Sequence, residues 1–180
     1  MIAAIVLAAG ESSRFGSPKQ LLLLGRVLEN VRDAGLDDII VVLGAHAEEI
    51  REAVGFLGER VVVNPDYREG MSTSIRCGLR ALREGAEGAM IVLGDQPYVT
   101  AETMARLAAE FRRTRPAALA PSFRGRRGNP LVIAAALFPE MMVLRGDSGF
   151  RAIAGRHAVS ELEVDDRGVL VDIDELRDLE

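Results

Sequence analysis

Small residues and two cations follow a short apolar run near the start of the chain. The run ends in Leu7-Ala8-Ala9-Gly10, and Arg14 and Lys19 come after it. Backbone N–H groups in a small-residue turn can form a concavity that binds an anion, and both cations suit a triphosphate. The spacing matches neither the P-loop nor the dinucleotide motif G-x-G-x-x-G. We therefore predict a nucleoside triphosphate site, with a plain strand-to-helix turn carrying solvated basic side chains as the alternative.

Aspartates follow two later apolar segments. Asp95 comes after the predicted strand 89–93, and ligands of open α/β sheets gather where strands end. A carboxylate there could hold Mg²⁺, which keeps several waters and is completed by substrate phosphates. Alternation places Asp172 and Asp174 on one face of an extended segment, which suggests a second carboxylate ligand. A helix-capping Asp95 and a solvated strand end at 172–174 are the alternatives.

The elements that must position these residues alternate along the chain. Short runs that are apolar at consecutive positions are typical of strands buried on both faces of a parallel sheet. We predict strands at Ala3-Leu7, Ile39-Leu43, Arg60-Val63, Ala89-Leu93 and Ala117-Ala120. We predict helices at Arg26-Ala34, Ala47-Gly55, Ser72-Glu84 and Ala101-Arg113. This alternation indicates an α/β fold with right-handed crossovers.

The last third of the chain has a different pattern. It holds a Gly/Arg loop at 124–129, an apolar run at 130–137 and a short predicted helix from Ser148. Further strands are predicted at Ser160-Val164 and Val169-Val171, on either side of a turn. The sequence contains no linker or repeat, so residues 1–180 are predicted to form a single domain.

Composition excludes several classes of protein. Hydrophobic residues make up 48% of the chain and charged residues 27%, as in an ordinary globular protein. A net charge of -5 argues against nucleic-acid binding, which needs a basic face. The apolar opening at 1–9 is too short to span a bilayer, so no membrane association is expected. The single cysteine, Cys77, is consistent with a reducing cytoplasm, where we expect the protein.

The first loop also carries a family resemblance. L-A-A-G-x-S-x-R-x-G-x-x-K resembles the signature of the MobA-like nucleotidyltransferases, and most closely that of the molybdenum cofactor cytidylyltransferases. Similar motifs continue along the chain at Asn64-Pro65, at 70–74, at Gly78-Leu79, at 94–97, at 127–130, at 146–149 and at 171–174. The resemblance implies a three-layer Rossmann-like fold, with a mostly parallel sheet covered by helices on both faces. It also implies Mg²⁺ and the transfer of CMP from CTP to molybdenum-loaded molybdopterin, with release of pyrophosphate.

The resemblance assigns roles to residues at the matching positions. Catalysis is expected from Arg14, Lys19 and Asp95, which would align the substrates and stabilise charge. Asp95 and Asp174 are the expected metal ligands, with Asp172 as the second choice to Asp174. The nucleotide is expected to contact Leu7, Ala8, Ala9, Gly10, Arg14, Lys19, Asn64, Ser72, Ser74, Gly78 and Gly94. The acceptor is expected to contact Gln96, Arg127, Gly128, Asn129 and Pro130.

The basic cluster of Arg124, Arg126 and Arg127 has two interpretations. It is either a solvated loop or a site that captures the phosphate or dithiolene end of the acceptor. The sequence alone leaves both open.

The identity of the base and of the acceptor is less constrained. By resemblance to the family, in which L-A-A-G with G-D-Q-P goes with cytidine and L-A-G-G with guanosine, Ala9 favours CTP; a methyl group there would narrow the space that a purine needs. The alternatives are GTP, another phosphorylated acceptor, or a non-catalytic protein that delivers the cofactor to a molybdoenzyme or its chaperone. Two segments, at Leu24-Gly25 and Asp174-Glu175, are shorter than the family pattern. Each is either a true deletion, which at the first segment would leave the first helix short, or a place where residues are missing from the given sequence.

Overall fold

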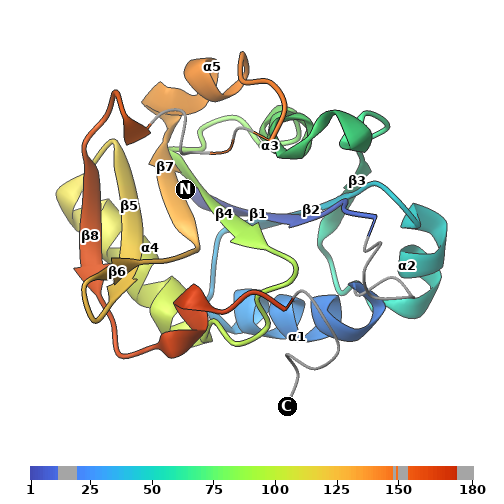
Figure 1. The fold of residues 1–180 in the computed structure, drawn as a ribbon, viewed down its shortest axis with the longest axis horizontal. Helices are drawn as coiled ribbons and strands as arrows, with labels where there is room; N and C mark the ends of the chain where they lie inside the picture. The colour runs from blue at the N-terminus through green and yellow to red at the C-terminus, as the bar shows by residue number, and fades with distance from the viewer. Residues whose placement is uncertain (12–19, 148, 150–153, 174–180) are drawn as a thin grey trace.

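The computed structural model describes residues 1–11, 20–147, 149 and 154–173 (Figure 1). Arg14, Lys19, Ser148 and Asp174 lie outside the described residues. The described strands are β1 (Ile2–Ala8), β2 (Asp38–Leu43), β3 (Arg60–Val63), β4 (Gly88–Leu93), β5 (Ala118–Phe123), β6 (Arg126–Arg127), β7 (Leu131–Ala134) and β8 (Val159–Glu163). The described α-helices are α1 (Gln20–Asp33), α2 (Ala47–Ala53), α3 (Met71–Arg80), α4 (Ala101–Thr114) and α5 (Phe138–Met141). Single 3-10 turns form η1 (Tyr67–Glu69), η2 (Ala135–Leu137) and η3 (Arg167–Leu170).

One sheet joins the described strands in the order β3-β2-β1-β4-β7-β5-β6, with β8 paired to β5. Strands β1 to β4 run parallel to one another, whereas β7 is antiparallel to both of its neighbours, β4 and β5. The chain moves outward from β1 to β3 and then returns to place β4 on the other side of β1. This reversal makes the boundary between β1 and β4 the topological switch point, where open α/β sheets bind ligands.

Helices cover both faces of the sheet (Figure 1). Alternate residues of β1 supply the two cores: Ile2, Ala4 and Val6 belong to the cluster that includes α1, α2 and α4. Ile5 belongs to the opposite cluster, which includes α3 and α5. Because successive side chains of a strand point to opposite faces of the sheet, the single strand β1 contributes residues to two separate cores. The predicted three-layer, mostly parallel α/β fold is confirmed.

The first helix is longer than the sequence analysis expected. Helix α1 begins at Gln20 rather than Arg26, so the predicted start of this helix is wrong. Its apolar residues Leu24, Val27, Leu28 and Val31 are fully buried. This i, i+3, i+4, i+7 spacing is the face of an amphipathic helix, and it already includes Leu24.

The last third holds the other differences. The predicted strand Val169-Val171 is wrong, because this part of the chain forms η3 and then continues without regular structure. Asp166 initiates η3, since its side chain accepts a hydrogen bond from the Gly168 amide at 2.9 Å. The apolar run at 130–137 divides into β7 and η2, and α5 follows it without having been predicted. No helix in the described ranges is both long and apolar enough to cross a membrane.

Candidate active site

The site is built where β1 and β4 end side by side. Leu7 and Leu93 are partners in the parallel ladder, and the Gly94 amide then donates a hydrogen bond to the Leu7 carbonyl at 2.9 Å. The turn after β1 and the residues after β4 therefore leave the sheet together. The structure thus brings the predicted nucleotide segment Leu7-Gly10 next to the predicted metal ligand Asp95.

Gly94 allows this close approach. A Cβ at Gly94 would lie 2.8 Å from the Leu7 carbonyl oxygen and 3.2 Å from the Ala8 Cβ. The first distance is shorter than a van der Waals contact and involves backbone, which cannot rotate away. Any larger residue would therefore push Asp95 away from the β1 turn.

Ala9 packs against the neighbouring strand end. Its carbonyl accepts a hydrogen bond from the Ala45 amide at 3.2 Å, and a Cβ at Gly44 would lie 2.8 Å from the Ala9 Cβ. The Ala9 side chain is buried, with 6% of its surface exposed. Its methyl group therefore lies against β2. Any effect of Ala9 on which base is bound would therefore come from the position of the turn after β1.

The segment after η3 lies against the end of β4. The Ile173 amide donates to the Asp95 carbonyl at 3.0 Å, and the Gln96 side-chain amide donates to Asp172 Oδ1 at 2.6 Å. Gln96 is 2% exposed, so this contact is shielded from solvent on the glutamine side. The structure therefore places Asp172 beside the end of β4, and the buried Gln96 orients it. The predicted role of Gln96 in acceptor binding stays a prediction.

A carboxylate-based metal site is chemically consistent with this edge. Asp95 and Asp172 both lie on segments that meet here, and carboxylate oxygens are ligands that Mg²⁺ prefers. Asp174, the first choice for the second ligand, lies outside the described residues. The described residues contain no group of three or more His, Cys, Asp or Glu side chains arranged to hold a metal. Substrate phosphates and water would have to complete such a site.

Asn64 organises the turn that leads from β3 to α3. Its side-chain nitrogen lies 2.7 Å from Thr73 Oγ1 and 3.0 Å from Ser74 Oγ, and its Oδ1 accepts from the Asp66 amide at 3.0 Å. Asn64 is 3% exposed. The predicted nucleotide residues Asn64 and Ser74 are thus brought together, with the Asn64 amide directed to the protein itself.

Two motifs that are far apart in sequence meet at the start of α3. The Met71 amide donates to Asp147 Oδ1 at 3.3 Å, and the Ser72 amide donates to the Gly146 carbonyl at 3.1 Å. The Ser72 side chain is fully buried, and its hydroxyl has no hydrogen-bond partner in the described part of the chain. The hydroxyl is thus a buried donor without a partner among the described residues, and its predicted contact with the nucleotide stays a prediction.

Gly78 lies in the interior rather than at the strand ends. A Cβ at Gly78 would lie 2.3 Å from the Ile5 Cγ2 atom. The glycine thus lets α3 pack closely on β1, which accounts for its presence without a ligand. Its nucleotide contact stays a prediction.

The predicted acceptor residues 127–130 lie beside η3 and lead into β7, whose first residue, Leu131, pairs with Ile91 near the end of β4. Arg127 pairs with Glu161 at 2.7 Å, and the Gly128 amide donates to the Pro121 carbonyl at 2.9 Å. The Asn129 amide donates to the Val169 carbonyl at 2.9 Å. Pro130 is buried just before β7. The backbone of this group holds η3 against the sheet, and its contact with an acceptor stays a prediction.

Asp166, which no sequence pattern singled out as a site residue, fixes η3 from the opposite side. Asp166 Oδ2 accepts from the Thr100 amide at 3.0 Å, the Thr100 hydroxyl at 2.9 Å and the Thr103 hydroxyl at 2.7 Å. Asp166 is 8% exposed, so the carboxylate is a buried clasp between η3 and α4. A turn aspartate could have been expected to bond locally, but its long-range partners had no signal in the sequence.

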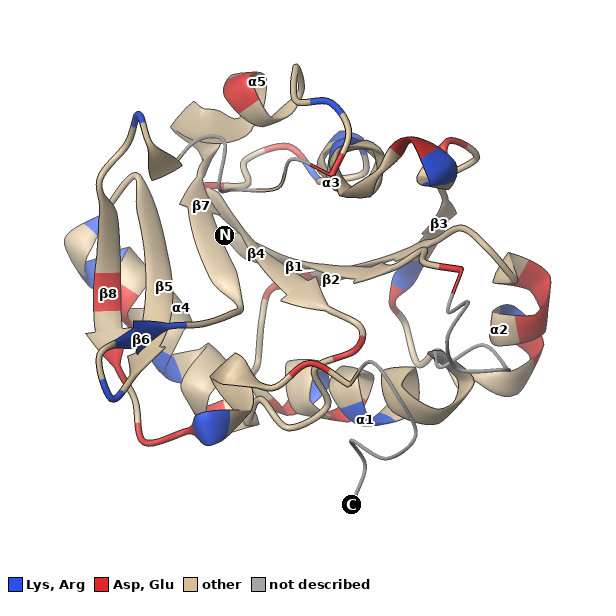
Figure 2. Cartoon of the chain, in the orientation of Figure 1, with Lys and Arg blue, Asp and Glu red and all other residues tan. Residues whose placement is uncertain are grey.

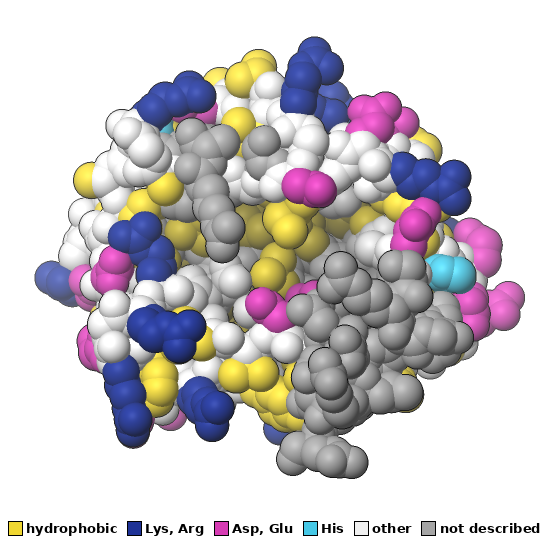
Figure 3. Space-filling model, viewed as in Figure 1, with side chains coloured by type: hydrophobic (Ala, Val, Ile, Leu, Met, Phe, Trp, Pro, Cys, Tyr) yellow, Lys and Arg dark blue, Asp and Glu magenta, His cyan; other side chains and the backbone are white. Residues whose placement is uncertain are grey.

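The surface around the strand ends is hollowed (Figure 3). Hydrophobic side chains form the floor of this hollow, and acidic side chains lie at its edge. A shaped depression with an apolar floor and a few polar groups is typical of a small-molecule site. A doubly wound sheet with a small-residue turn and a carboxylate at its switch point defines a nucleotide-binding α/β protein.

Comparison with known proteins identifies the family. The model of the MobA-like NTP transferase domain matches residues 4–162. The chain belongs to this family of nucleotidyltransferases. Nicotine blue oxidoreductase of Paenarthrobacter nicotinovorans is 33% identical over 163 residues, which cover 83% of this chain and 79% of the relative. GlmU of Symbiobacterium thermophilum is 34% identical over 117 residues, 59% of this chain, but the match spans only 24% of that bifunctional protein.

Solved structures share the whole fold. The crystal structure of Rv0371c from Mycobacterium tuberculosis H37Rv is 34% identical, with a TM-score of 0.88 over 99% of this chain and 95% of that one. Rv0371c has also been crystallised in complex with manganese, and that structure has a TM-score of 0.85, at 34% identity over 99% of this chain and 95% of that one. A nucleotidyl transferase from Methanothermobacter, Mth528, is 28% identical, with a TM-score of 0.84 over 99% of this chain and 94% of that one.

Proposed function

We propose that this chain transfers CMP from CTP to molybdenum-loaded molybdopterin, with Mg²⁺ as its cofactor and pyrophosphate as the second product. The observation that supports this most is the position of Asp95, held beside the turn after β1 at the switch point of the sheet. Membership of the MobA-like family supports nucleotidyl transfer as the reaction type. The proposed base rests on the family resemblance at Ala9. The proposed acceptor rests on the family resemblance of the motifs in the last third of the chain.

The chain's own residues would act mainly by alignment. Backbone N–H groups at 8–10 would bind the triphosphate, and Arg14 and Lys19 would neutralise charge on the pyrophosphate leaving group. Asp95, with Asp174 or Asp172, would hold Mg²⁺, which lowers the charge on the phosphates when bound. A phosphate on the acceptor is already anionic at neutral pH and can attack the α-phosphorus directly. The bond from the α-phosphorus to the bridging oxygen then breaks, and no protein nucleophile is required.

The manganese complex of Rv0371c supports a divalent metal in this family of sites. Manganese and magnesium both accept oxygen ligands in octahedral geometry. The carboxylates at the end of β4 are therefore suited to either ion. The predicted partners, a molybdoenzyme or its chaperone that receives the product, belong to the same proposal, and so does the predicted location in the cytoplasm.

A nucleotide and acceptor panel tests the proposal. Purified protein would be incubated with CTP, GTP, ATP or UTP, each with molybdenum-loaded or metal-free molybdopterin, and released pyrophosphate would be measured with and without Mg²⁺. We expect release with CTP and the loaded acceptor only, and only with Mg²⁺. Release with GTP but not CTP would overturn the base assignment. Release with metal-free but not molybdenum-loaded molybdopterin would overturn the acceptor assignment.

A redox role is the second candidate, because one relative covering most of this chain is named an oxidoreductase. This candidate predicts consumption of an electron donor in the presence of an electron acceptor. Such consumption without pyrophosphate release in the panel above would favour it over nucleotidyl transfer. Family membership and the carboxylates at the end of β4 favour transfer.

A further inference from the structure

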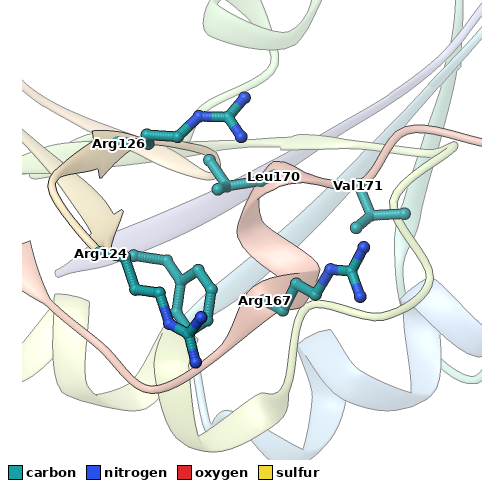
Figure 4. A pocket seen from close by; sticks show the side chains of 6 residues that line it. Arg124, Arg126, Arg167, Leu170 and Val171 are labelled. Atoms are coloured by element: carbon teal, nitrogen blue, oxygen red, sulfur yellow. The ribbon is translucent and has the colours of Figure 1, made fainter.

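A second pocket lies between η3 and the hairpin of β5 and β6. It has a volume of about 280 Å³ and is lined by Phe123, Arg124, Arg126, Arg167, Leu170 and Val171. Figure 4 shows Arg126 on one side of Leu170 and Arg167 on the other, with Arg124 extending from the hairpin. Arginines from segments about 40 residues apart thus surround one small cavity with an apolar wall. Figure 2 shows the same concentration of basic residues at β6 and η3.

The acidic side chains nearest the hairpin are already engaged. Glu161 pairs with Arg127 at 2.7 Å. Glu163 accepts from the Ser122 hydroxyl at 2.7 Å and from the Arg124 backbone amide at 2.8 Å. The Ser122 hydrogen bond and then the backbone amide hold the pKa of Glu163 below its ordinary value. These two acids therefore hold the hairpin, and neither forms an ion pair with Arg124, Arg126 or Arg167.

Within the described ranges, none of the three pocket arginines forms an ion pair. Across the described part of the chain, no carboxylate lies within ion-pair distance of the Arg124, Arg126 or Arg167 guanidinium groups. Most other arginines do pair, including Arg32, Arg60, Arg68, Arg112, Arg113, Arg115 and Arg127. Three like charges around one cavity repel one another unless an anion lies between them, and an arginine fork suits an oxyanion.

The pocket is held rigidly with respect to the end of β4. The buried Asp166 fixes η3 to the start of α4, and a Cβ at Gly168 would lie 2.2 Å from the Tyr98 carbonyl oxygen. Arg167 lies between these two anchored positions. Its guanidinium therefore starts from a fixed backbone, and less freedom is lost when it binds an anion.

The pocket wall continues into the candidate active site. Leu170 and Val171 line the pocket, Asp172 accepts from Gln96, and the Ile173 amide bonds to the Asp95 carbonyl. Even a fully extended chain from Leu170 to Ile173 would span at most about 11 Å. A single small molecule can therefore reach both the end of β4 and the arginines.

We propose that the arginine pocket binds an oxyanion at the far end of the acceptor substrate, remote from the phosphate that attacks the nucleotide. This inference rests on the proposed nucleotidyl transfer and narrows its acceptor. The acceptor class is a molecule with an anionic group at each end, separated by roughly the length of the segment from Leu170 to Ile173, about 10 Å. Its body has an apolar face that lies against Leu170 and Val171. The pocket should therefore discriminate against acceptors that have only one anionic end, because such a molecule would leave the arginines without an anion.

Phenyl phosphate is a suitable probe, since it joins an oxyanion to an apolar ring. Isothermal titration would measure its affinity for the full chain and for Arg126→Gln and Arg167→Gln, with and without saturating CTP. Arg113→Gln on α4 is the control, because it removes the same charge away from the pocket. We expect each pocket variant to weaken phenyl phosphate binding about 10-fold, in line with a lost charged hydrogen bond. The control and the affinity for CTP should change less than twofold.

Several results would overturn the inference. One is unchanged phenyl phosphate affinity in both pocket variants, or no binding to the wild-type chain at all. Another is an equal loss of CTP affinity, which would assign the arginines to the triphosphate instead. Arg167→Lys, which keeps the charge without the fork, should lose less affinity than Arg167→Gln.

In the transfer assay, the pocket variants should raise the KM for the acceptor and leave the KM for CTP unchanged. If the pocket variants transfer the nucleotide with an unchanged KM for the acceptor, the proposed role of the pocket is refuted and the proposed function stands. If phenyl phosphate binds at the pocket but the chain transfers no nucleotide, the proposed function alone is refuted.

Discussion

Replacing Gly94 by alanine should separate the two strand ends that form the candidate active site. The new Cβ would lie 2.8 Å from the Leu7 carbonyl oxygen, whereas ordinary contact begins at 3.4 Å. The backbone would therefore have to yield by about 0.6 Å, and overpacking of this kind destabilises by about 1–3 kcal/mol. A displacement of 1 Å near reacting groups can reduce the rate about 100-fold, so we expect roughly a 10-fold loss of turnover here.

The matched control is Gly25→Ala, because no atom lies within 4 Å of a Cβ at that position of α1. Alanine favours a helix over glycine by about 0.5–1 kcal/mol, so this variant should be slightly more stable than the wild type. Urea unfolding would measure the free energy of unfolding of both variants, and pyrophosphate release would measure turnover. If Gly94→Ala unfolds like the wild type and keeps its full rate, the close packing of β1 and β4 does not position Asp95.

Three further predictions concern groups that hold the site in place. Asp166→Ala should lower the free energy of unfolding by about 2–4 kcal/mol, since the buried Thr103 hydroxyl and the Thr100 amide and hydroxyl lose their acceptor; a loss below 0.5 kcal/mol in urea unfolding would contradict the clasp. Asn64→Ala should cost about 2–3 kcal/mol for the same reason, and a normal melting temperature would argue against its role in the turn before α3. The lowered pKa of Glu163 stabilises the fold at pH above the ordinary value of 4.5, and this contribution is lost as the pH falls through the lower folded-state pKa. Glu163→Gln should therefore flatten the fall in stability below pH 4.5, and an unchanged acid-unfolding profile would contradict it.

Much of the sheet could be predicted from the sequence, because its strands are apolar at consecutive positions. Arg60–Val63 was predicted with its observed bounds, and the other parallel strands differ only at their ends. The start of α1 was missed, because the residues around Leu24 carry too many leucines to show which face is buried. The β-branched Val169 and Val171 favour a strand at this position. The hydrogen bond from the Gly168 amide to Asp166 turns it into η3 instead.

The candidate site was predictable where one short motif carries several of its residues. The motif at 94–97 located Asp95 and Gln96, and the structure shows that Gln96 orients Asp172. Contacts between distant segments could not be predicted in this way. The sequence singled out Arg124 and Arg126 but gave no reason to add Arg167, because only the folded chain brings η3 to the hairpin.

The central claim is that Asp95, beside the turn after β1, serves nucleotidyl transfer from a nucleoside triphosphate. Its most direct test is pyrophosphate release by Asp95→Asn, which keeps the shape of the side chain and removes its charge. The account predicts a folded variant with the wild-type unfolding curve and at least about a 100-fold lower rate, as for loss of one strongly stabilising electrostatic group. A folded Asp95→Asn protein that releases pyrophosphate at the wild-type rate would contradict it.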